Sequence, residues 1–195
     1  DTDGSLHIST SSTYTAGGNT TLAGSLTIDA AATFTPGAFT LTASATTTGK
    51  TLNAPVTTLG ALTFNGAGGG WTFSANATTS NLTITSGTVV APTNLSISGA
   101  YTNSGTYTHN SGTLLMNGSS PQTLAGTLTG TSALNNVTMT AAGTKTFSNN
   151  ASTTNLTIEA SSGAVTAPTN LSIAGNYTNN GTLTTGAGTV LFDGA

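Results

Sequence analysis

The chain of 195 residues contains very little charge. It has two Lys or Arg and five Asp or Glu, so charged residues make up 4% of the sequence, against about 25% in an ordinary globular domain. Proteins that bind nucleic acid neutralise phosphates with clustered Lys and Arg, and Lys50 and Lys145 are too few to form such a cluster. We therefore expect no nucleic-acid partner and no site that depends on grouped charges.

Cysteine is absent, so disulfide bonds are excluded and the redox compartment is left open. No run of about 18 apolar residues occurs, and hence no transmembrane helix or membrane insertion is predicted. The residues after Asp1 lack a basic stretch followed by an apolar one, so the sequence shows no signal peptide. The composition nevertheless favours an extracellular or cell-surface location, with any leader already removed.

Hydroxyl side chains dominate what is present: 47 Thr and 21 Ser account for more than a third of the residues, and Gly adds another 25. Disordered segments usually combine low hydrophobicity with high net charge. Here the net charge is only −3 and apolar residues make up 35% of the chain. These values favour a folded chain.

Internal repeats organise the sequence. Residues 71–84 (WTFSANATTSNLTI) return at residues 145–158 (KTFSNNASTTNLTI), and residues 91–97 (APTNLSI) return at residues 167–173. We interpret residues 71–144 and 145–195 as a full and a truncated copy of a repeat of about 75 residues. Residues 1–70 follow the pattern loosely and are read as divergent N-terminal coils, so that residues 1–195 form a single elongated domain.

A finer rhythm runs inside the long repeat. Segments such as Asn-Leu-Thr-Ile and Thr-Tyr-Thr recur about every ten residues, separated by Gly, Asn, Ser and Pro. Alternation of apolar residues with Thr is typical of half-buried strands, and no helical spacing is found. We predict an all-β fold, a parallel β-helix or β-solenoid of nine or ten coils with about 20 residues each. Right-handed winding is the default for parallel crossovers.

Residues 176–194 (NYTNNGTLTTGAGTVLFDG) resemble repeats of large bacterial surface proteins, the Thr-, Gly- and Asn-rich β-solenoids of the filamentous-haemagglutinin and autotransporter-adhesin type. The resemblance covers most of residues 71–195. It implies a right-handed β-helix with an extracellular, structural or adhesive role, and host or environmental surfaces as partners. It supplies no catalytic motif, and the chain differs from a long adhesin in being short and in lacking an anchor or translocator.

The ionisable residues do not suggest an active site. Asp29 and Glu159 each follow a Leu-Thr-Ile strand, so we expect them at equivalent turns of distant coils, whereas acid–base pairs need carboxylates about 5–9 Å apart. His7 and His109 are predicted to be solvated turn residues. We expect no enzymatic activity and no cofactor. Calcium is the one metal considered, because Asp1-Thr2-Asp3-Gly4 resembles part of a calcium loop, with Asp193 as a further candidate ligand.

The second repeat stops at Asp193-Gly194-Ala195, where the first continues from Asn117-Gly118 into residues 119–124. A solenoid leaves unpaired strand edges at both ends unless these are capped. We predict that the strand of residues 5–9 resumes the ladder of a second copy, so that identical chains assemble head to tail into an extracellular filament or surface fibre. The assembly interface is predicted to comprise Asp1, Asp3, Leu6, Ile8, Leu191, Phe192 and Asp193.

Three alternatives stay open. The chain could be a non-catalytic segment of a large bacterial adhesin. It could bind ice through outward Thr pairs, although the Thr-x-Thr triplets (33–35, 40–42, 106–108, 127–129, 138–140 and 182–184) recur irregularly. Exposed aromatic rings could bind carbohydrate, although alternation with Thr predicts that most are buried.

The sequence also permits asparagine-linked glycosylation, because it contains the acceptor pattern Asn-x-Ser/Thr. The candidate sites are Asn19, Asn76, Asn81, Asn94, Asn117, Asn136, Asn150, Asn155, Asn170 and Asn176.

Overall fold

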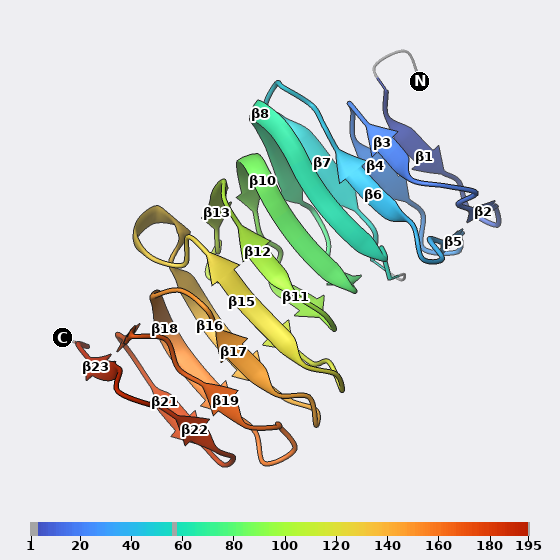
Figure 1. Ribbon diagram of the computed structural model, residues 1–195. Coiled ribbons are helices and arrows are strands. Elements are labelled where there is room, and N and C mark those ends of the chain that lie inside the picture. Colours follow the sequence, from blue (N-terminus) through green and yellow to red (C-terminus); the bar gives the residue numbers. More distant parts are fainter. Residues whose placement is uncertain (1–3, 56–57, 195) are drawn as a thin grey trace.

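A computed structural model describes residues 4–55 and 58–194. The chain winds into a β-solenoid of about nine turns in which 54% of the residues lie in strands (Figure 1). Strand pairings throughout the described part are parallel, as in Leu6–Ile8 with Leu26–Ile28 and Asn170–Ile173 with Thr189–Phe192. The predicted all-β parallel solenoid is therefore confirmed, and its right-handed winding stays a prediction.

The pairings define three sides, which the chain visits in a fixed order. The first side begins each coil; it contains β1 (Leu6–Ile8), β4 (Leu26–Ile28), β7 (Lys50–Asn53), the end of β8 (Ala61–Phe73), the end of β10 (Asn81–Val90), β13 (Thr106–Thr108), the start of β18 (Ala151–Ile158), β20 (Asn170–Ile173) and β23 (Thr189–Phe192). Between β13 and β18 this side is occupied by the 3₁₀ helix η1 (Gly130–Ser132).

The second side follows; it contains β2 (Thr13–Thr15), β5 (Thr33–Thr35), β9 (Ala77–Thr79), β11 (Asn94–Ile97), β14 (Thr113–Met116), β16 (Leu134–Met139), the end of β18 and β21 (Tyr177–Asn179). The third side closes each coil; it contains β3 (Thr20–Leu22), β6 (Thr40–Ala43), the start of β8, the start of β10, β12 (Tyr101–Asn103), β15 (Gln122–Gly126), β17 (Lys145–Phe147), β19 (Val165–Thr166) and β22 (Leu183–Thr184). No helix in the described segments has the length and apolar character needed to span a membrane.

Coil length varies although the strand register is maintained. Residues paired in adjacent coils are 18 positions apart between Ala77 and Leu95, and 26 apart between Leu26 and Leu52. The additional residues lie in the turns, where a solenoid tolerates insertions because each coil bonds only to its neighbours. The predicted 20 residues per coil thus describes the mean and not a strict period.

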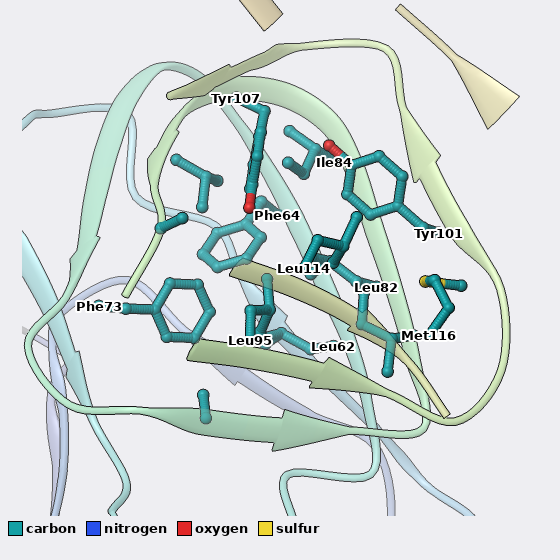
Figure 2. Close-up of a cluster of buried hydrophobic side chains, with 14 of the residues drawn as sticks. Leu62, Phe64, Phe73, Leu82, Ile84, Leu95, Tyr101, Tyr107, Leu114 and Met116 are labelled. Carbon is teal, nitrogen blue, oxygen red and sulfur yellow. The ribbon is translucent and has the colours of Figure 1, made fainter. Parts of the chain in front are cut away.

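Alternation along each strand builds the core. Apolar side chains at every second position point into the coil, and those in register on adjacent strands stack along the axis, as Leu62, Leu82 and Tyr101 do. Figure 2 shows one section of this core, with Phe64, Phe73 and Tyr107 meeting inside the coil. The intervening Thr residues point outward, so the period of two dictates which residues are buried.

The long repeat does not span a whole number of coils. The segment Asn-Leu-Thr-Ile lies on the third side at residues 81–84 and on the second side at residues 155–158. Likewise, Asn94–Ile97 lies on the second side and its copy, Asn170–Ile173, on the first. The second copy is therefore rotated by one side relative to the first. Because all three sides need the same inward and outward alternation, one sequence fits any of them.

Glycine forms the corner between the third and first sides where β8 and β10 pass through it. A Cβ on Gly66 would overlap the carbonyl oxygen of Ala45 in the preceding coil and approach the Trp71 ring. In the next coil Gly87 has φ +85° and would meet the carbonyl oxygen of Gly66. At this corner, successive backbones approach too closely for any larger residue.

We predict that Gly66→Ala lowers the free energy of unfolding by at least about 2 kcal/mol, because the new methyl group overpacks a fixed backbone. The fluorescence of Trp71, the single tryptophan, reports unfolding in urea at this corner. Gly17→Ala is the matched control: nothing lies within 4 Å of its Cβ position, and a surface change of this kind shifts stability by about 0.5 kcal/mol or less. Equal midpoints for the two variants would contradict the proposed packing.

Candidate interaction surfaces

Asp29 forms the one ion pair found in the described part of the chain. Its Oδ1 lies 3.1 Å from His7 Nε2, and its Oδ2 accepts hydrogen bonds from the Thr10 backbone N–H at 3.0 Å and the Thr10 hydroxyl at 3.2 Å. These hydrogen bonds, with that of His7 the largest, lower the pKa of Asp29. His7 is exposed, as predicted for a solvated residue, but it lies on strand β1 and not in a turn, and it binds Asp29 of the next coil.

The remaining carboxylates stay apart. Asp29 follows β4 on the first side and Glu159 follows β18 on the second, so they do not occupy equivalent turns as predicted. Asp193 accepts a hydrogen bond from the Ser172 hydroxyl at 2.8 Å. Within the described ranges no three His, Asp or Glu residues gather. The calcium candidates Asp1 and Asp3 lie outside these residues.

Lys145 is a buried cation held without a carboxylate. Its ammonium nitrogen donates to the carbonyl oxygens of Gly118 (3.3 Å), Thr140, Ala141 (2.7 Å) and Gly143 (2.6 Å). Burial lowers the pKa of Lys145. Sequence reasoning missed this site, because nothing in the sequence shows that the turn of residues 140–143 directs its carbonyl groups inward.

Gln122 lies in register with Lys145 one coil earlier and has a similar role. Its amide nitrogen donates to Ile97 and Gly99, each at 2.8 Å, and its amide oxygen accepts from the Gly118 backbone N–H at 2.8 Å. Gly118 contacts both buried side chains: its N–H donates to Gln122 of its own coil, and its carbonyl oxygen accepts from Lys145 of the next coil. The three residues thus link successive coils. Both buried polar groups make their hydrogen bonds to backbone atoms, so neither is buried without a partner.

Several asparagines of the glycosylation pattern have a structural role. At the corners, the side-chain oxygen of each accepts the backbone N–H of the residue in register one coil later. This pattern holds for Asn19 with Thr40, Asn76 with Asn94, Asn81 with Ala100, Asn150 with Asn170, and Asn155 with Asn176, at 2.7–3.0 Å. The pattern Asn-x-Ser/Thr arises because each of these corners is followed by an inward residue, which is Thr20 after Asn19 and apolar in the other four, and then by an outward Thr or Ser. Glycosylation itself stays a prediction.

Asn136 and Asn117 also form side-chain bonds between coils. Asn136 accepts a hydrogen bond from the Asn155 amide at 2.7 Å, and Asn117 donates to the Ser96 hydroxyl at 3.3 Å. These side-chain hydrogen bonds add to the backbone hydrogen bonds that join adjacent coils.

The aromatic residues are mostly internal, as predicted. Those buried in the core are Phe34, Phe64, Trp71, Phe73, Tyr101, Tyr107 and Phe147. Burial raises the pKa of both Tyr101 and Tyr107. Two rings are exposed, Phe39 at 37% and Phe192 at 58%. They lie far apart along the axis and do not form a stacking platform for a sugar chain.

Threonine forms two regular rows on the third side. Thr21, Thr42, Thr63, Thr83 and Thr102 lie in register on successive strands, and Thr123, Thr146, Thr166 and Thr184 form a second row further along. The Thr-x-Thr triplets are distributed over all three sides, and only two of them, residues 40–42 and 182–184, lie on the third side. The other threonines of the two rows are single residues on the remaining third-side strands. Successive hydroxyls are about 4.8 Å apart, the spacing between strands.

The two ends of the solenoid carry open strand edges. Within residues 4–55 and 58–194, β1, β2 and β3 each pair only with the following coil, and β21, β22 and β23 only with the preceding one (Figure 1). The incompletely buried apolar residues that pack against the core all lie on these strands; they are Leu6, Tyr14, Tyr177, Leu183 and Val190. Leu191 and Phe192 on β23 are more than half exposed, whereas Ile8 on β1 is buried.

Four surface depressions are lined mostly by Thr, Asn, Gly, Ser, Ala and Pro, with few large apolar side chains and no charged one. Comparison of the chain with protein-family models, curated proteins and solved structures found no match.

We predict that Lys145→Met lowers the free energy of unfolding by about 1–3 kcal/mol, because carbonyl groups of the turn lose their buried donor. Lys50→Met is the matched control, since Lys50 is half-buried on β7 and is the only other lysine. Urea unfolding measures both variants, and acylation of the folded chain should modify Lys50 while sparing Lys145. Rapid acylation of Lys145 would contradict the buried site.

Proposed function

We propose that the chain is a structural subunit of an extracellular filament or cell-surface fibre, in which solenoids assemble head to tail. The observation that carries this proposal is the continuous ladder of parallel strands, in which each coil offers its strand edges to the next coil along one axis. Unpaired edges are templates for further strands. A contact between two different ends does not close on itself and so generates an open polymer.

The scarcity of charge supports the same function. With 4% charged residues, two chains meet with little of the electrostatic repulsion that keeps soluble proteins apart. The resemblance to bacterial surface repeats supports an extracellular location. In a filament the function is mechanical: hydrogen bonds run along the axis, and no catalytic residue is required. Further coils of a longer adhesin would use the same edges in the same manner.

The first test is assembly of the 195-residue chain, measured by sedimentation over a range of concentrations and by electron microscopy. We expect concentration-dependent filaments one solenoid wide. Phe192→Lys should raise the concentration needed for assembly about tenfold or more, because burial of a phenylalanine contributes about 1.5–3 kcal/mol. Phe39→Lys, which changes the other exposed ring, should leave assembly unaltered. A monodisperse monomer at high concentration would overturn the proposal.

Ice binding is a second candidate function, favoured by the threonine rows of the third side. Each row offers methyl and hydroxyl groups at a fixed interval on a rigid sheet, an arrangement able to order water in a lattice. In the described part of the chain, none of the nine threonines in these rows uses its hydroxyl in a protein hydrogen bond. Their hydroxyls are thus left for solvent.

Thermal hysteresis and the shape of ice crystals grown with the protein test this candidate. Thr83→Glu should abolish both effects, because it inserts a charge into the row on the third side. Thr157→Glu is the matched control: it makes the same change in the same Asn-Leu-Thr-Ile sequence, placed on the second side. Absence of hysteresis with the unaltered chain, or equal loss in both variants, would exclude an ice-binding third side.

A further inference from the structure

We propose that the turn of residues 140–143 and Gly118 of the preceding coil form a receptor for a primary ammonium group. In this chain the receptor is occupied by Lys145, which supplies the ammonium on its own side chain. The same site takes a small primary alkylammonium ion once the lysine side chain is shortened. The receptor lies inside the solenoid and is independent of the proposed filament.

The site presents only hydrogen-bond acceptors to its occupant. Four carbonyl oxygens surround the Lys145 nitrogen, and they belong to Gly118, Thr140, Ala141 and Gly143. An ammonium group has three N–H donors and no acceptor, so it matches this environment. A hydroxyl or an amide at the same position would turn oxygen lone pairs toward carbonyl oxygens.

Two of the four carbonyl groups depend on the ammonium. In the described part of the chain, the carbonyl oxygens of Thr140 and Gly143 accept no hydrogen bond except that of Lys145. The Gly118 oxygen also accepts the Gly143 backbone N–H, at 3.2 Å, and the Ala141 oxygen accepts a backbone N–H of the following coil, at 3.0 Å. Removal of the ammonium therefore leaves two carbonyl groups without a partner, which costs free energy. Binding of a free ammonium ion recovers this cost.

The neutral counterpart Gln122 shows why this turn needs a cation. Gln122 lies in register with Lys145, and its side chain also reaches back into the turn before its strand. That turn presents both kinds of group: Gln122 donates to two carbonyl oxygens and accepts the Gly118 N–H. An amide, with its donor and its acceptor, fits there. The turn before Lys145 presents oxygen atoms alone, so its occupant has to be purely a donor.

The charges around the site favour a single positive charge. The only ion pair in the described segments joins His7 to Asp29, so no carboxylate pairs with Lys145. Backbone carbonyl groups gathered around one point are a known environment for monovalent cations. Divalent cations, in contrast, usually take carboxylate ligands in proteins.

Shortening of the lysine side chain tests the receptor. Lys145→Ala keeps Cβ and removes three methylene groups and the ammonium, which together correspond to n-propylammonium. We expect Lys145→Ala to unfold at a lower urea concentration than the unaltered chain, as followed by Trp71 fluorescence. Addition of n-propylammonium at ten times its dissociation constant should lower the unfolding equilibrium constant of this variant about tenfold, because the ion binds only the folded chain.

Two further additives separate shape from charge. 1-Propanol has a similar shape without the charge, and tetramethylammonium has the charge without an N–H donor, so neither should stabilise Lys145→Ala. The matched controls are the unaltered chain and Lys50→Ala. Neither should respond to n-propylammonium, because Lys145 occupies the receptor in both.

Each outcome decides for or against the receptor. Stabilisation of Lys145→Ala by n-propylammonium alone supports it. If this variant does not fold by itself, recovery of the folded chain with n-propylammonium, and not with the other two additives, supports it equally. Equal effects of the three additives, an equal effect of n-propylammonium on Lys50→Ala, or no response of Lys145→Ala to the ion would overturn it.

Discussion

Every level of this structure depends on the hydrogen-bonded register between one coil and the next. A parallel strand pairs only with the strands above and below it, so the chain has to return to the same side at the same height after each turn. The turns vary from coil to coil, as the interval of 18 residues from Ala77 to Leu95 and that of 26 from Leu26 to Leu52 show. Corners must absorb this variation. Glycine does so where backbones approach closely, and asparagine where a backbone N–H lacks a carbonyl partner.

Much of this fold is predictable from the sequence because the rule behind it is local. Strict alternation of apolar residues with Thr determines which side chains are buried, so the strands around Leu82 and Leu156 and the buried aromatic residues follow directly. Gly- and Asn-rich turns between short strands indicate a solenoid. These features need no knowledge of which segments meet.

The candidate sites are less predictable because they arise from contacts across coils. His7 and Asp29 are 22 positions apart, and only the actual length of that coil brings them together. Lys145 depends on the direction of four carbonyl groups in turns, which the residue types do not dictate. The rotation between the two copies of the repeat could not be predicted for the same reason. The sequence gives the length of the repeat in residues, but the number of solenoid sides that this length covers depends on the length of each turn.

The rotation also bears on which function the fold favours. End-to-end stacking needs only the alternation of inward and outward residues, which is the same on all three sides and is preserved when a repeat is copied with a rotation. A specialised face on one side is different, because copying moves Thr83 of the third side to the position of Thr157 on the second. A specialised face therefore requires particular residues on one side that copying of the repeat does not place there. The ability to stack, in contrast, is present in every coil. Assembly along the axis is thus the property that this architecture supports most directly.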